Sequence, residues 1–309
     1  MNILTSYHNP DLDGFASVYA YFELLQKFGT DVKIFFEGDL NLETTYLVKR
    51  LNLDLSYSLA NGITIMDKII LLDTSQINEL PRGIVLDQVV EIVDHHPITD
   101  DKYFTNAKKQ IEMVGACASL VAERYHDRNI KPSLFANILL YCAIASNTLR
   151  LNSKITTDKD RKMFAWLESN NSNMTSYVDE SFRAKSNLDG ELLSKALLGD
   201  SAEKLFNGKK VIIFQIEAYD ARVVAENRKA EILEIIKNFI SESGNYDYAF
   251  LSLLDLRENC NVFIAINDES KALLTRLLNV TFLNGIAVRP GYIMRKELWV
   301  MIKNVLEIT

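Results

Sequence analysis

The chain has 309 residues, 48% of them hydrophobic, and its 34 Lys and Arg against 41 Asp and Glu give a net charge of −7. The length predicts two domains, and the hydrophobic share is ample for a core. A protein that coats long nucleic acid needs a basic balance, so we expect no such partner. An acidic chain can still hold a small anion where metal ions or a few cations are focused.

Composition also bears on the compartment. The longest apolar runs, such as Ile138–Ala145, are far shorter than the ~20 residues of a membrane span, and the first residues do not resemble a signal peptide. The three cysteines, Cys117, Cys142 and Cys260, are widely spaced and odd in number. Such thiols are typical of a reducing cytosol. We therefore expect a cytoplasmic protein without a membrane partner.

In the first half of the chain, strand patterns alternate with helical patterns. This alternation predicts an α/β domain with a parallel sheet covered on both faces. The expected strands are Asn2–Tyr7, Asp31–Phe36, Lys68–Asp73 and Val89–Asp94. The expected helices are Phe15–Phe28, Glu43–Leu51, Gly115–Tyr125, Ser133–Ala145 and Thr156–Ser169.

A second strand and helix pattern begins after a polar stretch, Ser181–Gly199, which we expect to be helical with an interruption at Leu188–Gly190. The expected strands are Lys210–Ile216, Tyr248–Asp255 and Asn261–Ile266. The expected helices are Ala221–Ser243, Ser270–Leu278 and Glu297–Leu306. The sequence thus predicts one domain over residues 1–186 and a smaller one over 196–309.

Polar and acidic residues follow the apolar elements of the first half. His8, Asp11 and Asp13 come after the first strand, Asp73 ends another, and Asp94-His95-His96 ends a third. A buried helix likewise ends at Asn147. Each end alone is also compatible with an ordinary strand stop, because Asp forms strands poorly. Ligands of open α/β sheets bind beyond the carboxyl ends of strands, so together these ends indicate a site.

Carboxylates mixed with imidazoles suit Mn²⁺, Fe²⁺ or Co²⁺ better than Ca²⁺, which prefers oxygen ligands alone. Converging carboxylates repel each other unless a cation neutralises them. Two ions about 3.5–4 Å apart would do so and would activate a water molecule. This chemistry suits hydrolysis of phosphoanhydrides or phosphodiesters.

The motifs carry a resemblance to a known family. Asn9–Asp13, Leu72-Asp73 and Asp94-His95-His96 resemble the DHH phosphoesterase superfamily. Gly208–Glu217 and Pro290–Lys296 resemble the second domain of manganese-dependent (family II) inorganic pyrophosphatases, which also occurs in exopolyphosphatases and Prune proteins. The likeness spans nearly the whole chain. It implies a DHH domain, a smaller C-terminal α/β domain, an active site in the cleft between them and a homodimer through the N-terminal sheet edge.

The resemblance also implies a ligand set for two divalent ions, with Mn²⁺ expected and Co²⁺ or Mg²⁺ as alternatives. Asp73 would bridge the two ions and Asp11 would bind the first. Asp13 and His95 would bind the second. Asp94 would hold an imidazole in the required tautomer.

The same resemblance implies residues for a small phosphate-containing substrate. His96 would face the phosphate and help to protonate or orient it. Arg295 and Lys296 would bind the phosphate from the second domain, Arg with a planar fork and Lys as a point charge. Lys204 is a further candidate, although its spacing to Gly208 is shorter than in the family.

Three positions depart from the pyrophosphatases. Tyr7 stands where they have a metal-binding His, which leaves the neighbouring His8 as an alternative ligand. Asn147 replaces an Asp and would be a neutral, weaker ligand. Glu297 replaces a Lys beside the phosphate site. All three changes would weaken a site for compact pyrophosphate and imply a divergent member of the family.

Two classes of function therefore stay open. The first is a metal-dependent phosphohydrolase that acts on pyrophosphate or a related phosphoanhydride, with a nucleotide or short-oligonucleotide phosphodiesterase as its alternative. The second is a catalytically weak regulatory protein that binds phosphate or a nucleotide.

Overall fold

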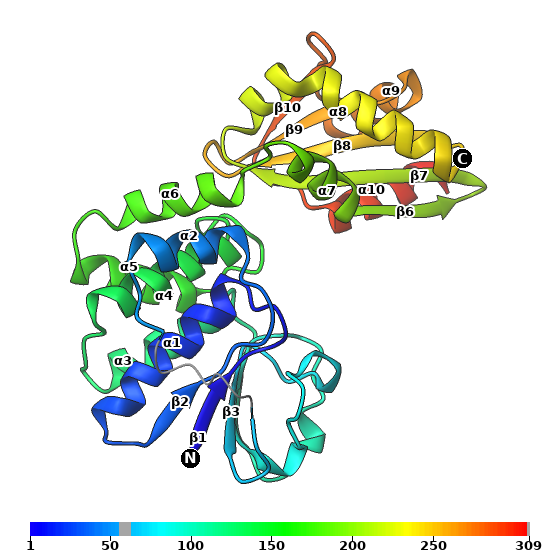
Figure 1. Ribbon diagram of the computed structural model, residues 1–309. Helices are drawn as coiled ribbons and strands as arrows, with labels where there is room; N and C mark the ends of the chain where they lie inside the picture. Colours follow the sequence, from blue (N-terminus) through cyan, green and yellow to red (C-terminus); the bar gives the residue numbers. More distant parts are fainter. Residues whose placement is uncertain (56–62, 308–309) are drawn as a thin grey trace. The chain divides into compact units, whose positions relative to one another are not determined.

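The computed structural model describes residues 1–55 and 63–307. The chain divides into two compact units, Met1–Lys185 and Ser186–Thr309, each built around its own sheet (Figure 1). Among the described residues, no helix combines the length and hydropathy that a bilayer span requires.

The first unit contains a five-stranded sheet in which every neighbouring pair is parallel. Its strands are β1 (Asn2–Thr5), β2 (Val32–Ile34), β3 (Lys68–Leu72), β4 (Val89–Asp94) and β5 (Lys108–Ile111), in the order β2-β1-β3-β4-β5. The parallel sheet predicted for the N-terminal domain is confirmed. Parallel order brings the carboxyl ends of β1, β3 and β4 to one edge, which is where the acidic motifs follow.

Six α-helices belong to the described part of the first unit. They are α1 (Leu12–Lys27), α2 (Leu42–Arg50), α3 (Cys117–Asp127), α4 (Leu134–Asn147), α5 (Asp158–Asn170) and α6 (Met174–Lys185). Short 3₁₀ turns lie at Ile77–Glu79, Leu86–Gln88 and Asp101–Tyr103. The helix α4 is buried from Ala136 to Ser146 because it packs against α1, α3, α5 and α6. Helices α2 and α6 lie side by side (Figure 1).

The second unit contains a mixed five-stranded sheet in the order β10-β9-β8-β7-β6. Its strands are β6 (Ser201–Phe206), β7 (Lys209–Ala218), β8 (Tyr248–Asp255), β9 (Cys260–Ala265) and β10 (Ile286–Pro290). Its helices are α7 (Glu191–Gly199), α8 (Ala221–Ser243), α9 (Asp268–Leu278) and α10 (Arg295–Leu306). Only β7 and β8 run parallel, and the other neighbouring pairs are antiparallel.

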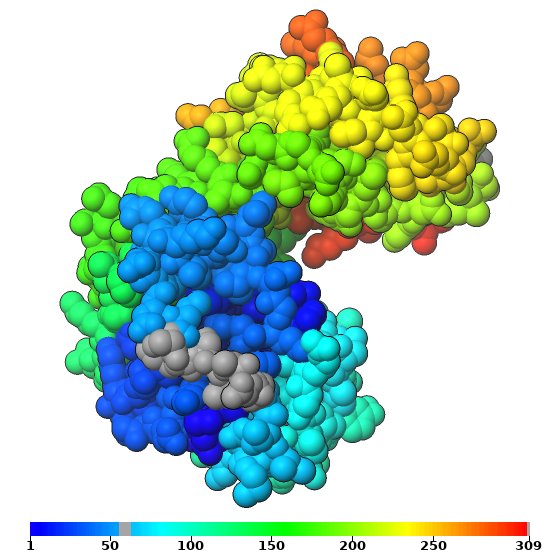
Figure 2. Space-filling view, in the orientation of Figure 1, coloured from blue at the N-terminus to red at the C-terminus, as the bar shows by residue number. Residues whose placement is uncertain are grey.

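Alternation along β7 gives the second unit two core layers. Ile212 and Phe214 face the layer beneath α7 and α8, whereas Val211 and Ile213 face the layer beneath α9 and α10. Successive strand residues point to opposite faces, so one apolar run serves both layers. The outer side of α8 forms a long stretch of the surface of this unit (Figure 2).

The sequence analysis missed some elements and misplaced others. It did not predict β5, β6 or β10, which lie at sheet edges and carry charged residues or proline. The expected helix Ser181–Gly199 is wrong in its start, since α6 begins at Met174. Its expected interruption is present, because α6 ends at Lys185 and α7 begins after Gly190, whose φ is 56°.

Candidate metal centre

The acidic residues of the first unit occupy turns that the parallel sheet places together. Asp73 follows β3 directly and Asp94 is the last residue of β4. Asp73 has a φ of 62°, which is uncommon for a residue with a side chain. Its amide donates to the carbonyl of Val93 at 2.8 Å, and this bond to β4 holds the turn in place. The backbone therefore holds Asp73 at the carboxyl edge of the sheet.

Asp73 and His95 form the centre of the site. The Oδ1 atom of Asp73 lies 3.1 Å from Nε2 of His95, and both side chains are buried. Among the residues that the structure describes, neither atom has an aligned hydrogen bond. Buried polar atoms without partners are rare in native structures, and a shared cation would satisfy both of these. Asp73, His95 and His96 place ligand atoms within 4.8 Å of one another, so they fit a divalent ion.

The orientation of His95 suits a metal ligand. Its Nδ1 lies 2.9 Å from the carbonyl of Val114, which can only accept, so Nδ1 is the donor. This leaves Nε2 as the nitrogen that faces Asp73, the arrangement usual for ligating histidines. Burial lowers the pKa of His95, but the carboxylates of Asp73 and Asp13 outweigh it and raise the pKa to about 10. Binding of a cation at Nε2 would therefore release a proton.

Asp13 is fully buried and holds the start of another helix. Its two carboxylate oxygens accept from the amides of Cys117 and Ala118, each at 2.8 Å, in the first turn of α3. The N-cap residue of α3, Ala116, has no polar side chain, so Asp13 supplies the cap from α1. Nδ2 of Asn147, at the end of α4, also donates to Asp13 at 2.7 Å. Burial and the charge of Asp73 raise the pKa of Asp13.

Asp11 and Tyr7 lie on the other side of the α1 start. Oδ1 of Asp11 accepts from the amides of Asp13 and Gly14 at 2.8 and 3.1 Å, so Asp11 caps its own helix. The Tyr7 hydroxyl accepts from the Asp11 amide at 3.1 Å. Burial, followed by the charges of Asp11 and Asp73, raises the pKa of Tyr7 well above its usual range. A protonated phenol thus stands beside these carboxylates.

The structure does not bring His8 to this cluster. Its Nδ1 lies 3.6 Å from the carboxylate of Glu37, its side chain is 48% exposed, and its amide donates to the carbonyl of Glu79. These contacts of His8 do not support its expected role as a metal ligand.

Asp94 holds the second histidine. Its Oδ1 accepts from Nδ1 of His96 at 2.8 Å and from the amide of His95 at 2.7 Å, while Oδ2 accepts from the hydroxyl of Ser75. Burial raises the pKa of Asp94, but the hydrogen bonds from His96 and Ser75 outweigh it and leave this pKa lowered. The bond to Asp94 in turn raises the pKa of His96, whose side chain is 37% exposed. The sequence analysis missed Ser75. A hydroxyl two residues after Asp73, the carboxylate at the end of a strand, is a pattern that can indicate a hydrogen-bond donor at the site.

Residues 2–146 match the family model described as "DHH family, N-terminal domain". This stretch is therefore similar to the N-terminal domain of the DHH family. This stretch contains Asp11, Asp13, Asp73, Asp94 and both histidines of the cluster, and it ends one residue before Asn147.

The similarity extends beyond the DHH domain. A manganese-dependent inorganic pyrophosphatase from Bacillus subtilis is 27% identical over 296 residues, which cover 96% of this chain and 95% of the relative. A Methanococcus jannaschii protein assigned to the family II inorganic pyrophosphatases shares the fold, with a TM-score of 0.59, 24% identity and 99% coverage of both chains. An exopolyphosphatase-related protein from Bacteroides fragilis aligns at a TM-score of 0.51 and 12% identity, over 99% of this chain and 91% of its own. The predicted two-domain α/β fold is confirmed by this likeness.

In the second unit, two of the three cations expected at the substrate lie at the start of α10, and the third contacts this helix one turn further on. Arg295 opens this helix, and its guanidinium pairs with Asp200, Nη2 lying 2.6 Å from Oδ1. Lys296 follows and is exposed. Lys204 on β6 is exposed too, with Nζ 5.4 Å from the centre of the Trp299 ring, one turn along α10. Lys204 thus contacts α10 one turn after Arg295, whose charge is already paired with an acid.

Glu297 has a local partner that the sequence analysis did not foresee. Its Oε2 accepts from the amide of Met294 at 3.1 Å, which makes it the third-position acid of a capping box at the α10 start. Its carboxylate therefore stabilises the helix that carries Arg295.

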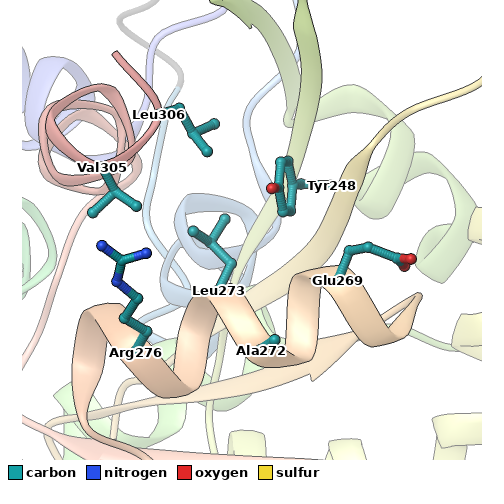
Figure 3. Close-up of a pocket in the computed structure, with 7 residues that line it drawn as sticks. All are labelled: Tyr248, Glu269, Ala272, Leu273, Arg276, Val305 and Leu306. Atoms are coloured by element: carbon teal, nitrogen blue, oxygen red, sulfur yellow. The ribbon is translucent and has the colours of Figure 1, made fainter. Parts of the chain in front are cut away.

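A separate pocket of about 380 Å³ lies in the second unit between α9 and α10 (Figure 3). It is lined by Tyr248, Glu269, Ala272, Leu273, Arg276, Val305 and Leu306. None of the candidate site residues lines this pocket, so the DHH-domain cluster rather than the pocket supports a chemical role.

Proposed function

We propose that the protein is a metal-dependent phosphohydrolase that acts on pyrophosphate or a related phosphoanhydride. The observation that carries this proposal is the close approach of two buried atoms, Oδ1 of Asp73 and Nε2 of His95, which lie 3.1 Å apart among converging carboxylates. Similarity over nearly the full length to a manganese-dependent inorganic pyrophosphatase supports the metal and the bond class.

The proposed cofactor is a pair of divalent ions, with Mn²⁺ favoured over Co²⁺ or Mg²⁺. Asp73 would be shared by both ions, Asp11 would bind the first, and Asp13, His95 and Asn147 would bind the second. Bound ions would polarise a phosphoryl oxygen and lower the pKa of water. Asn147 would bind the ion only with its amide oxygen turned toward it, because in the structure the amide nitrogen faces Asp13.

The chain itself would supply proton transfer and charge. Because Nδ1 of His96 donates to Asp94, Nε2 is the nitrogen that can give up a proton when the ring is protonated, and we assign His96 to the protonation of the leaving phosphate. Arg295, Lys296 and Lys204 are the proposed phosphate ligands. Arg295 would bind with donors that its pair with Asp200 leaves available.

The test is hydrolysis of pyrophosphate in the presence of Mn²⁺ by the natural chain and two variants. Asp73→Asn should lower kcat/KM by roughly 10³-fold or more, about 4 kcal/mol of transition-state stabilisation. Asp87→Asn changes an exposed carboxylate of the same unit and should leave the rate unchanged. A rate that survives Asp73→Asn would mean that this site does not carry the reaction.

A phosphate- or nucleotide-binding regulatory role is the second candidate. It is favoured by two neutral groups beside the cluster, namely the Tyr7 phenol, which accepts from the Asp11 amide, and the Asn147 amide, which donates to Asp13. The same assay with tripolyphosphate and dinucleotides, paired with calorimetry, separates the candidates. Binding without turnover on every substrate would support the regulatory role, whereas cleavage of dinucleotides alone would support a phosphodiesterase.

We also propose a homodimer through an edge of the N-terminal sheet, whose edge strands are β2 and β5. On β5, Lys108 and Lys109 are exposed, and their charges would weaken pairing between two copies of this strand. Light scattering at rising salt concentration tests the proposal, since screening of these charges should favour the dimer. A monomer at all salt concentrations would contradict it.

A further inference from the structure

One peptide unit connects His95 to a buried acid on another helix. The carbonyl of Val114 accepts from Nδ1 of His95 at 2.9 Å, and the amide of Gly115 donates to Oδ2 of Asp160 at 2.8 Å. These groups belong to the same planar peptide, in which C=O and N–H point in opposite directions. Fixing the N–H therefore aims the C=O at the histidine.

Asp160 is itself held firmly. It is fully buried in the first turn of α5, where Oδ2 also accepts from the amide and the hydroxyl of Thr157, at 2.7 and 2.6 Å. Its Oδ1 accepts from the hydroxyl of Ser119 at 2.6 Å. The bonds to Thr157 cap α5, but the bonds to Gly115 and Ser119 reach other elements and are not needed for that cap.

Ser119 links Asp160 to a second ligand candidate. It lies in the first turn of α3, whose amides from Cys117 and Ala118 bind Asp13. Asp160 thus contacts both the peptide that orients His95 and the helix start that holds Asp13.

The fit around this peptide is tight. A Cβ atom at Gly115 would lie 2.9 Å from Oδ2 of Asp160 and 2.5 Å from Cγ2 of Thr148. Because there is no space for a side chain, the carboxylate approaches the peptide directly.

We propose that Asp160 is a positioning residue that fixes the ring orientation of His95 through the Val114–Gly115 peptide. The inference rests on the proposed function in one respect, namely that His95 Nε2 binds a divalent cation. Loss of the Asp160 carboxylate frees the peptide to rotate, so the Val114 carbonyl no longer holds the hydrogen bond from Nδ1 that orients the ring.

The experiment compares Asp160→Ala, Asp160→Asn and Ser119→Ala. Solvent exchange of the His95 Nδ1 proton is followed by NMR in ¹⁵N-labelled, metal-free protein, and Mn²⁺ affinity is measured by calorimetry. Asp160→Ala should speed the exchange and weaken Mn²⁺ binding by roughly 10- to 100-fold. Asp160→Asn should keep the slow proton exchange and the Mn²⁺ affinity of the natural chain, because an amide oxygen can still accept from Gly115. Ser119→Ala leaves the bond from the Gly115 amide to Asp160 intact, so exchange of the His95 Nδ1 proton should stay slow in this variant.

A slowly exchanging His95 proton and unchanged Mn²⁺ affinity in Asp160→Ala would overturn the inference, whatever happens to thermal stability. If that variant does not fold, Asp160→Ser keeps a polar group on α5 but is too short to reach Gly115, and the same outcomes apply. Failure of the natural chain to bind Mn²⁺ would refute the proposed metal site instead. The proton exchange in metal-free protein would still decide the role of Asp160.

Discussion

Asn147 donates a hydrogen bond from Nδ2 to Oδ2 of Asp13 at 2.7 Å, which joins the end of α4 to the start of α1. With the two α3 amides, it gives this buried carboxylate three donors. The amide partly compensates Asp13 without adding a positive charge. It also occupies the oxygen of Asp13 that lies 3.6 Å from His95 Nε2.

The first prediction concerns Asn147→Asp. Without metal, the new carboxylate should face that of Asp13 and lower the free energy of unfolding by about 1–3 kcal/mol, since a bond to a buried charge is lost. With Mn²⁺, the same carboxylate should strengthen binding. Thermal unfolding with and without Mn²⁺ measures both effects, and Asn129→Asp, at an exposed position, is the control. An Mn²⁺-induced shift in Tm no larger than that of the natural chain would contradict the assignment.

The second prediction concerns pH. The carboxylates of Asp73 and Asp13, acting against burial, raise the pKa of His95 to about 10 from 6.5. The metal-free native state therefore keeps a proton on His95 that the unfolded chain loses above pH ~6.5. The contribution of this proton to the free energy of unfolding is complete below that pH and disappears as pH rises through about 10. Urea unfolding across this range should show the decline.

His95→Gln should remove most of that decline, whereas His126→Gln, on α3 away from these carboxylates, should retain it. An equal pH dependence in both variants would show that another group is responsible.

The third prediction separates two roles of Glu297. Glu297→Gln keeps an acceptor for the Met294 amide, so the free energy of unfolding should not change. Loss of the negative charge should lower KM for pyrophosphate if phosphate binds near Arg295. Glu297→Ala removes the cap as well and should cost about 1 kcal/mol. Chemical denaturation and steady-state kinetics check the pair. An unchanged KM in Glu297→Gln would place the phosphate elsewhere.

The fourth prediction uses two glycines. Gly115→Ala should destabilise the protein by about 1–3 kcal/mol, because its Cβ would overlap Thr148 and Asp160. Gly199→Ala meets no atom within 4 Å and should be nearly neutral. Differential scanning calorimetry gives the comparison. Equal Tm values for the two variants would show that the packing at Gly115 relaxes easily.

The central strands could be predicted from the sequence because their apolar runs are strong, as in Lys68–Leu72 and Val89–Asp94. The missed strands are all at edges. Lys108–Ile111 begins with two lysines, and Ile286–Pro290 ends in Arg and Pro. Edge strands avoid strong apolar patterns because these would promote pairing with other chains, so they give little sequence signal.

The site shows a similar division. Strand ends indicated Asp73, Asp94 and the two histidines, because the carboxyl edge of a parallel sheet is a place that sequence can locate. Sequence did not decide between Tyr7 and His8, since both lie in a bend after β1, where no regular alternation fixes the direction of a side chain. It also gave no sign of the Val114 carbonyl, because a backbone partner has no residue type to recognise.

The cap that Asp13 provides for α3 limits what mutagenesis at this position can report. A substitution there removes a charge from the cluster and, at the same moment, two hydrogen bonds from the first turn of a buried helix. Lost activity in such a variant would have two causes that kinetics alone cannot separate. Among the described residues, the Asp73 side chain caps no helix. A substitution at Asp73 therefore tests the chemistry without also removing a helix cap.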